Sequence, residues 1–318
     1  MIISRTPFRV SFIGGGTDLP SFYEKQQGAV ISTAINKYVY ITANERFDSD
    51  TRVSYSQTEI VKNVYEVKHP LFREAMIQAG IWSGVEVTSV SDLPAGTGMG
   101  SSSSFTVGAL KALLALRGFG ATPRDLAHGA CEIEMGILKE PIGRQDQYAA
   151  AYGGFRRYLF NADGTVETEP VLCGIDRRMN FFNHLMLFYL GGTRSASQVL
   201  RTVNSDQSHL IRIRALVNDF YTVLTGLGDL RPLGEILHEG WESKKLSADV
   251  SNPLIDEAYA KARKAGALGG KILGAGQAGF LLLFVEPRNK LFVRQDLRHF
   301  REVPFEYEPS GSRVVYEG

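Results

Sequence analysis

Apolar residues recur along the chain with two different periods, and the two alternate from one end to the other. Alternating or β-branched runs predict strands at 8–13, 39–42, 52–55, 85–90, 155–160, 185–189 and 280–285, with a last strand near 303–307. Apolar positions at helical spacing predict helices at 70–80, 105–116, 205–225, 231–245, 253–266 and 289–300. The chain is thus predicted to mix strands and helices throughout, without a detectable internal repeat.

One more helix is predicted to begin at Thr122. A Thr cap, Pro123 in the first turn and Asp125 at the third position form a helix start signal. Glu132 and Glu134 flank the apolar stripe of this helix, and the local pattern favours a solvated face for Glu134. The predicted buried stripe consists of Leu126, Ala130, Ile133 and Ile137.

The segment 94–104, Pro-Ala-Gly-Thr-Gly-Met-Gly-Ser-Ser-Ser-Ser, carries the strongest chemical signal. Its three alternating glycines let the backbone approach a ligand closely, and its serines can cap the helix that follows. Free N–H groups at a helix N-terminus favour phosphate. A flexible surface loop with a Ser cap would not need small residues at nearly every position. Because no Lys follows Gly100, we interpret the segment as an atypical nucleotide phosphate loop with serines available to Mg²⁺.

Length and composition limit the remaining possibilities. The 318 residues suffice for two domains, and a turn followed by a polar stretch places the expected boundary near 165–180. A net charge of +1 gives no global field that would attract nucleic acid or a membrane. The two cysteines provide neither a disulfide framework nor metal-ligand spacing. No apolar run could span a membrane and the first residues do not form a signal peptide, so we expect a cytoplasmic protein.

Two charged residues have both a structural and a chemical interpretation. Asp146 lies in a Gly-Arg-Gln-Asp-Gln segment between helices, where the local sequence favours a capping role over a base or a metal partner. Arg9 lies in the first predicted strand, where a surface position is the simplest interpretation. Phosphoryl transfer would use an acid near the acceptor hydroxyl, a nearby cation and a hard-oxygen site for Mg²⁺.

Three segments resemble the family of galactokinase, homoserine kinase, mevalonate kinase and phosphomevalonate kinase, in the order that family has. Segment 7–18, Pro-Phe-Arg-Val-Ser-Phe-Ile-Gly-Gly-Gly-Thr-Asp, is similar to the galactokinase signature Pro-Gly-Arg-Val-Asn-Leu-Ile-Gly-Glu-His-Thr-Asp. Segment 94–104 is a variant of the family's Pro-x-Gly-x-Gly-Leu-Gly-Ser-Ser loop. Segment 271–283 is similar to its late Gly-Ala-Gly-Gly-Gly loop.

The resemblance implies an α+β kinase of two domains, the first like ribosomal protein S5 over 1–170 and the second a ferredoxin-like α/β sandwich over 171–318. It implies that Asp146 faces the acceptor hydroxyl with Arg9 beside it as the catalytic residues, and that Ser102 and Glu134 hold Mg²⁺. These implied roles replace the local interpretations given above. The ATP-binding residues would be Pro94, Gly96, Gly98, Met99, Gly100, Ser101, Ser102, Ser103 and Ser104.

On the substrate side, the resemblance implies that Asp18 contacts sugar hydroxyls. Gly15 and Gly16 replace the Glu-His pair of galactokinase, which disfavours galactose. The motifs are most similar to the bacterial heptose 7-phosphate kinase branch of the family, which implies phosphorylation of the anomeric hydroxyl. The candidate substrate-binding residues are Gly15, Gly16, Thr17, Asp18, Arg144, Arg194 and Gly276, and the candidate cations for a substrate phosphate are Arg194, Arg144, Lys244 and Lys245.

Two other functions stay open at this point. A fucokinase-like sugar 1-kinase is the near alternative, and a non-catalytic sensor of sugar phosphates is the alternative from another class. Gly274, Gly276 and Gly279 match a dinucleotide fingerprint, but the loop leads into a predicted strand rather than a helix, which disfavours a dehydrogenase. The expected partner is a small-molecule sugar or sugar phosphate, with no nucleic acid or membrane, and a homodimer stays open.

Overall fold

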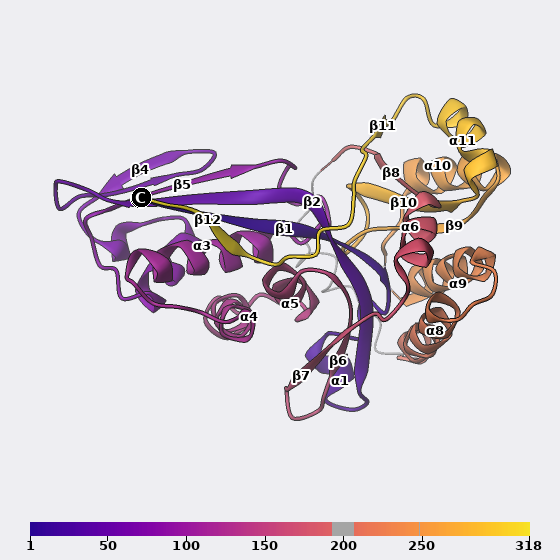
Figure 1. The fold of residues 1–318 in the computed structure, drawn as a ribbon, viewed down its shortest axis with the longest axis horizontal. Helices are drawn as coiled ribbons and strands as arrows, with labels where there is room; N and C mark the ends of the chain where they lie inside the picture. The colour runs from indigo at the N-terminus through magenta and orange to yellow at the C-terminus, as the bar shows by residue number, and fades with distance from the viewer. Residues whose placement is uncertain (193–206, 248) are drawn as a thin grey trace.

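The computed structural model describes residues 1–192, 207–247 and 249–318, and two β-sheets organise it (Figure 1). The larger sheet has the strand order β12-β1-β2-β5-β3-β4, with β6 paired to β2 and β7 paired to β6. Its strands are β1 (Ile2–Ile13), β2 (Gly28–Glu45), β3 (Thr51–Ser54), β4 (Thr58–Val61), β5 (Val85–Ser91), β6 (Phe155–Phe160), β7 (Val166–Pro170) and β12 (Arg313–Glu317). The smaller sheet has the order β11-β8-β10-β9 and comprises β8 (Leu185–Tyr189), β9 (Ala267–Ile272), β10 (Phe280–Val285) and β11 (Arg301–Glu302).

Helices cover both sheets and fill the space between them. The helix that follows the glycine-serine segment, α3 (Ser101–Leu116), packs against β1 and β2, and α9 (Arg231–Ser247) contacts both β9 and β1. The other helices are α1 (Pro20–Tyr23), α2 (Pro70–Gln78), α4 (Pro123–Cys131), α5 (Gln145–Tyr152), α6 (Ile175–Asn183), α8 (Ser208–Thr225), α10 (Pro253–Lys264) and α11 (Lys290–Asp296), with short helical turns at η1 (Val64–Glu66), η2 (Glu132–Ile137) and η3 (Pro287–Asn289).

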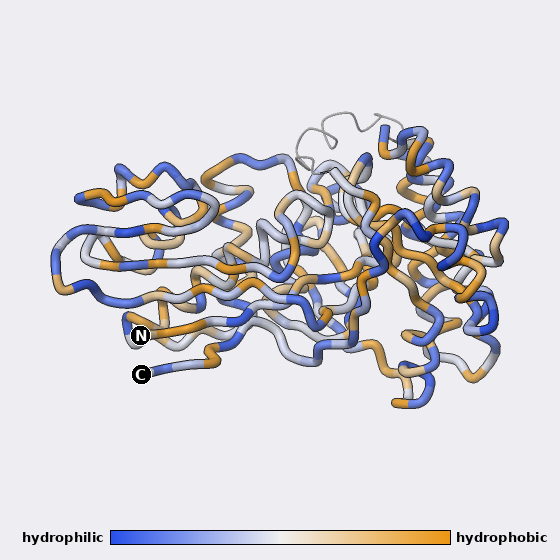
Figure 2. Tube along the Cα trace, turned by 90° about the horizontal axis from the view of Figure 1, so that it is seen from above, coloured by the Kyte–Doolittle hydropathy of each residue, from blue (hydrophilic) through white to orange (hydrophobic). Residues whose placement is uncertain are grey.

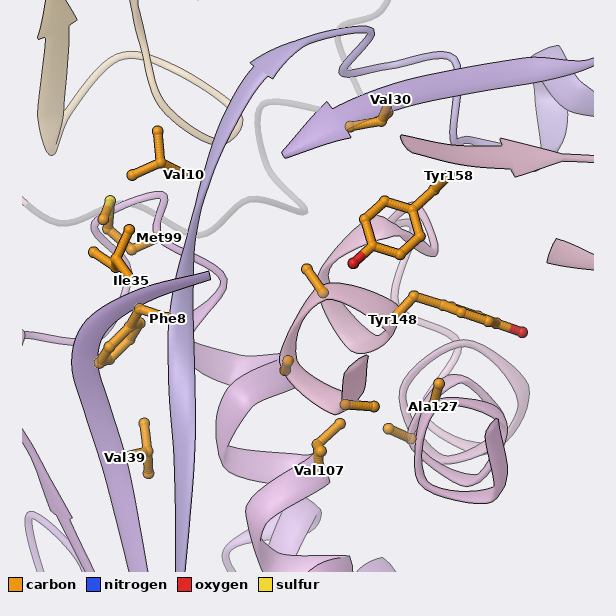
Figure 3. Packing of buried hydrophobic residues seen from close by; sticks show 14 of the residues in the cluster. Phe8, Val10, Val30, Ile35, Val39, Met99, Val107, Ala127, Tyr148 and Tyr158 are labelled. Carbon is orange, nitrogen blue, oxygen red and sulfur yellow. The ribbon is translucent and has the colours of Figure 1, made fainter. Parts of the chain in front are cut away.

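The apolar core joins the two sheets through α8 and α9. Its main cluster contains Phe8 and Ile41 of the larger sheet, Phe220 of α8 and Leu282 of the smaller sheet. Figure 3 shows Phe8 in the part of this cluster that lies beside the glycine-serine segment. A second cluster fills the opposite face of the smaller sheet, under α10 and α11. Figure 2 shows hydrophobic segments gathered inside the lobe that holds this sheet.

The strand predicted at 303–307 is wrong. In this segment only Tyr307 forms a β-bridge, to Ile35, and Pro304 has no N–H with which to extend a ladder. The last strand is instead β12, which pairs antiparallel with β1 and brings the two termini side by side (Figure 2). The chain thus returns to the sheet in which it began, and the domain ranges 1–170 and 171–318 stay a prediction.

The apolar stripe predicted after Thr122 is correct only in its first part. Thr122 caps α4 and forms a capping box with Asp125, as its sequence predicts. Beyond α4 the chain continues as a π-helix over Glu132–Ile137, in which the N–H of Leu138 donates to the carbonyl of Ile133. The wider turn changes which positions face inward. Ile137, predicted to be buried, is therefore 50% exposed.

Candidate active site

The glycine-serine segment folds into a tight loop that ends at the N-terminus of α3. Gly96, Gly98 and Gly100 have φ angles of +72°, +80° and +77°, a conformation that residues with a Cβ rarely adopt. At Gly98, a Cβ would lie 2.4 Å from the carbonyl oxygen of Leu273, so the two glycine-rich loops of the chain meet there. The arrangement leaves the N–H groups at the start of α3 available to an anion.

The substitution Gly98→Ala tests this close approach. The added methyl group would meet the backbone of Leu273 and would stand at a positive φ. We expect the Tm to fall by about 5 °C or more, together with weaker nucleotide binding. Gly120→Ala is the matched control, because no atom of the described residues lies within 4 Å of a Cβ at Gly120. Thermal melts and nucleotide titrations of both variants check the prediction, and equal effects of the two substitutions would contradict it.

A cavity of about 560 Å³ opens beside this loop. The residues that line it include Gly96, Gly98, Ser101, Ser102 and Ser103 of the predicted ATP-binding set, together with Glu134 and Gly276. Its wall away from the loop is largely aromatic and aliphatic, which suits a flat nucleotide base. The wall residues are Val39, Tyr55, His69, Pro70, Leu71, Phe105, Leu138 and Ile142.

Four residues of the predicted ATP-binding set shape the loop and are not part of this cavity lining. The carbonyl of Pro94 accepts a hydrogen bond from the Thr97 hydroxyl at 2.9 Å. Met99 is fully buried in the core (Figure 3). The remaining two are Gly100, which caps α3, and Ser104, whose hydroxyl donates to the carbonyl of Pro7 at 2.9 Å.

Glu134 is fully buried, contrary to the solvated face that the local pattern favours. Its Oε2 accepts hydrogen bonds from the Ser103 hydroxyl at 2.9 Å and from the Gln147 amide at 3.0 Å. Among the described residues its Oε1 has no hydrogen-bond partner. The nearby Thr106 hydroxyl donates to the carbonyl of Ser102 at 3.0 Å. Burial raises the pKa of Glu134 to about 7, although the hydrogen bonds oppose this.

A buried carboxylate oxygen without a partner, next to serine hydroxyls, fits the coordination of Mg²⁺. This ion takes hard oxygens, and in nucleotide sites one or two carboxylates suffice because phosphates and water complete its shell. Glu134 would supply the carboxylate, and Ser102 would supply a hydroxyl from the same cavity. Ser103, predicted only to bind ATP, also orients Glu134.

Asp146 and Arg9, predicted from distant parts of the sequence, form an ion pair. Arg9 Nε and Nη2 donate to the two carboxylate oxygens of Asp146 at 2.8 and 2.9 Å. Arg9 Nη1 donates to the carbonyl of Gly98 at 2.6 Å, which ties the pair to the glycine loop. A Cβ at Gly100 would lie 3.4 Å from both side chains. The Asp146 side chain keeps 26% of its surface exposed, whereas that of Arg9 keeps 4%.

Asp18 lies outside the lining of the nucleotide cavity and close to Asp146, and we call its surroundings the acceptor side. Its carboxylate accepts hydrogen bonds from the Gly16 N–H at 2.9 Å and from the Gln145 amide at 3.2 Å. Burial and the charge of Asp146 raise the pKa of Asp18. Gly15 lies beside the same Gln145 amide. The structure thus brings Gly15, Gly16 and Asp18 together beside Asp146.

Three predicted substrate contacts have other surroundings. The Thr17 hydroxyl is buried and donates to the carbonyl of Gly14 in its own loop and to that of Ala29 in β2. The Arg144 guanidinium lies over the Tyr23 ring and donates to the carbonyl of Gly164. Lys245 forms an ion pair with Glu242. Arg194 lies outside the described residues.

Sequence reasoning missed two residues of this site. Gln147 holds Glu134, and nothing in its local sequence marks it. Lys271 is buried near Arg9 and Asp18, and burial together with the charges of Lys244 and Arg9 lowers its pKa well below the ordinary value. A single Lys within the otherwise apolar end of β9 is a signal that could have found it.

Comparison with known proteins places the chain in a family. The model for the GHMP kinases N terminal domain matches residues 59–154, and the model for the GHMP kinases C terminal domain matches residues 216–298. The chain therefore belongs to the GHMP kinase family, which confirms the α+β kinase fold predicted from its motifs. It is a phosphotransferase that uses ATP and acts on an alcohol group of a sugar.

Several relatives match nearly the whole chain. It is 29% identical to a D-glycero-alpha-D-manno-heptose 7-phosphate kinase of Campylobacter jejuni, over 93% of each chain. It is 26% identical to a galactokinase of Pyrococcus furiosus, over 90% of this chain and 89% of that one. Among solved structures, a D-glycero-D-manno-heptose 1-phosphate kinase from Bacteroides thetaiotaomicron matches with a TM-score of 0.84 and 25% identity over 100% of both chains. Mevalonate kinase of Methanococcus jannaschii matches with a TM-score of 0.74 and 17% identity over 96% of this chain and 98% of that one, which shows the fold alone.

None of the helices in the described part of the chain has the length and apolar character needed to cross a bilayer.

Proposed function

We propose that this chain transfers the terminal phosphoryl group of Mg·ATP to the anomeric hydroxyl of D-glycero-D-manno-heptose 7-phosphate. The product is the 1,7-bisphosphate, an intermediate toward nucleotide-activated heptose. The observation that carries the proposal is the Arg9–Asp146 pair, which lies against Gly100 at the boundary between the nucleotide cavity and the acceptor side.

The residues around this pair have separate roles in the proposed phosphoryl transfer. The glycine loop and the N-terminus of α3 hold the ATP phosphates, because their N–H groups are oriented before the nucleotide arrives. Mg²⁺, held by Ser102 and Glu134, would neutralise charge on the phosphates. Asp146 orients the acceptor hydroxyl and takes its proton. Arg9 donates to both carboxylate oxygens of Asp146 and fixes their position.

The heptose assignment is supported by two relatives that span nearly the whole chain. One is described as a heptose 7-phosphate kinase and the other as a heptose 1-phosphate kinase, so the two names agree on the sugar and differ on the phosphate. The near alternative, a fucokinase, is supported by 24% identity to the Arabidopsis thaliana fucokinase/GDP-fucose pyrophosphorylase, of which this chain covers 31%.

A panel of acceptors tests the proposal. We expect kcat/KM with Mg·ATP for heptose 7-phosphate to exceed that for fucose, mannose, galactose and mevalonate by about 100-fold or more. The measurements are ADP release and phosphorus NMR of the product, which shows whether the new phosphate is on the anomeric oxygen. A higher kcat/KM for fucose would favour the fucokinase alternative, and ADP release with none of the acceptors would favour the sensor.

A further inference from the structure

A buried lysine, Lys271, and a partly buried one, Lys244, share the space between α9 and the end of β9. Gly269 of β9 packs on α9 so closely that a Cβ there would lie 1.8 Å from the carbonyl oxygen of Gly234. Because side chains alternate along a strand, Lys271 points to the same face, toward α9. Lys244, near the C-terminal end of α9, donates to the carbonyl of Gly274 at 2.5 Å, just beyond the end of β9. The two ammonium groups therefore converge from a helix and a strand.

The surroundings of these lysines are charged as well as buried. Burial and the charge of Arg9 lower the pKa of Lys244 to about 8, while Asp18 and Asp146 oppose this. Lys271 is 6% exposed, and among the described residues its ammonium group has no hydrogen bond or ion pair. A buried cation in such a position is costly to the folded protein unless an anion joins it.

Five ionisable side chains gather in this part of the site. Arg9, Lys244 and Lys271 are basic, and Asp18 and Asp146 are acidic. The Asp146 carboxylate already accepts hydrogen bonds from Nε and Nη2 of Arg9. The Asp18 carboxylate is held by N–H groups of the chain. Among the described residues, Lys271 is therefore the basic group of this set that has no partner, and an anionic ligand would supply one.

The location of the lysines indicates which ligand this is. Neither Lys244 nor Lys271 is among the residues that line the nucleotide cavity. Both are close enough to Asp18 for its charge to act on their pKa values. Lys244 and Lys271 therefore lie outside the lining of the nucleotide cavity and near Asp18, on the acceptor side as defined above.

We propose that Lys271, with Lys244 beside it, binds the phosphate monoester that the acceptor already carries. This inference rests on the proposed function and names the residues that select a phosphorylated sugar over its unphosphorylated counterpart. A phosphate dianion offers oxygens to both ammonium groups at once. It therefore reduces their mutual repulsion and compensates for the hydration that Lys271 loses on burial. The terminal phosphate of ATP could bind the same lysines. The kinetic tests below distinguish it from the phosphate of the acceptor, because they measure KM for ATP and for the acceptor separately.

The substitution Lys271→Met tests the assignment, because Met has a similar length and no charge. With heptose 7-phosphate as acceptor, we expect its KM to rise by about 10- to 100-fold, whereas the KM for ATP stays within about twofold. With the unphosphorylated heptose, kcat/KM should not change. Lys290→Met is the control, because Lys290 is a partly buried lysine whose ammonium group donates to the carbonyl of Leu185 at 3.1 Å. This control should leave all these constants unchanged.

Other outcomes would overturn the inference. If Lys271→Met lowers kcat equally for the phosphorylated and unphosphorylated sugars and leaves the acceptor KM unchanged, the lysine acts on the phosphate of ATP. If the KM for heptose 7-phosphate stays at the wild-type value, Lys271 has no part in binding it. Lys271→Arg keeps the charge, and we expect it to retain most of the preference for the phosphorylated sugar, which a role in packing alone would not predict.

A binding experiment separates this inference from the proposed function. Calorimetric titration compares mannose 6-phosphate with mannose, and heptose 7-phosphate with heptose, on the wild type and on Lys271→Met without turnover. Tighter binding of each phosphorylated sugar, lost in the variant, supports the lysine site even if heptose 7-phosphate is not phosphorylated. Equal affinity of the wild type for the phosphorylated and unphosphorylated sugars overturns the site, whichever sugar the enzyme accepts.

The Tm of the ligand-free protein distinguishes a binding role of Lys271 from a packing role, because the two roles predict changes of opposite sign. Because Lys271 is buried without a partner among the described residues, Lys271→Met should raise the Tm of the ligand-free protein by about 3–5 °C. A lysine retained for packing would instead lower the Tm when replaced. A fall in Tm together with an unchanged acceptor KM overturns the inference.

Discussion

Replacing Asp146 by Asn is expected to lower kcat by about 1,000-fold, whereas the affinity for ATP stays within about threefold. The carboxylate accepts two hydrogen bonds from Arg9, at 2.8 and 2.9 Å. An amide of the same shape has one acceptor oxygen and no charge, so it can neither take the hydroxyl proton nor accept both bonds from Arg9. Asp146 is not part of the nucleotide cavity lining, so ATP should still bind. Steady-state kinetics in both substrates and equilibrium ATP binding measure the two effects.

The control for this substitution is Asp229→Asn. Asp229 is an exposed aspartate whose carboxylate bonds to Arg231, remote from the glycine loop in sequence. We expect it to keep the wild-type kcat. Near-normal turnover of Asp146→Asn would remove Asp146 from the mechanism. Loss of ATP binding as large as the loss of kcat would show that Asp146 supports the loop rather than the reaction.

The glycine-serine loop was the part of the site that the sequence could predict best. Small residues at nearly every position of 94–104 serve a local purpose, since Gly96, Gly98 and Gly100 all have positive φ angles. The α3 helix begins at Ser101, directly after these glycines, as its apolar spacing predicts. Local geometry determines both features, and local geometry is what a short stretch of sequence encodes.

Glu134 shows where local pattern fails. Its spacing from Leu126 and Ala130 suggested the flank of an α-helix, but the chain changes to a π-helix at Glu132. One wider turn carries Glu134 inward and Ile137 outward, and a fixed period of 3.6 residues cannot show this. The resemblance of motifs, not the periodicity, suggested a buried role for Glu134.

Contacts between distant segments account for the other differences. Arg144 was a candidate for a substrate phosphate because it is basic and close to Asp146 in sequence. In the structure its guanidinium is engaged by Tyr23 and by the carbonyl of Gly164, and neither contact follows from the residues beside it. The sequence predicted no role for Lys271, because the environment of this residue depends on the packing of α9 against β9. Register and packing, which are non-local, decide such positions.

Replacing Glu134 by Gln is expected to lower kcat/KM by about 100- to 1,000-fold and to raise the Mg²⁺ concentration needed for half-maximal rate. Gln keeps the shape and can still bond to Ser103 or Gln147, but it removes the charge that would hold the ion. The control is Glu132→Gln, two residues earlier, where the side chain is exposed and contacts Gln78. The control should keep the wild-type Mg²⁺ dependence, and a similar shift in both variants would contradict a specific role for Glu134.

The same substitution should stabilise the protein when Mg²⁺ is absent. The pKa of Glu134 is about 7 in the folded chain against an ordinary value of 4.5, so between these values the folded state binds one more proton than the unfolded state. The free energy of unfolding therefore falls as the pH rises from about 4.5, and the loss is complete above about 7. Glu134→Gln removes this loss, so its Tm in EDTA should exceed that of the wild type at pH 8 and approach it at pH 5. A Tm difference that does not depend on pH would show that other groups already stabilise the charged form of the Glu134 carboxylate. The Mg²⁺ assignment would then lose its main structural support.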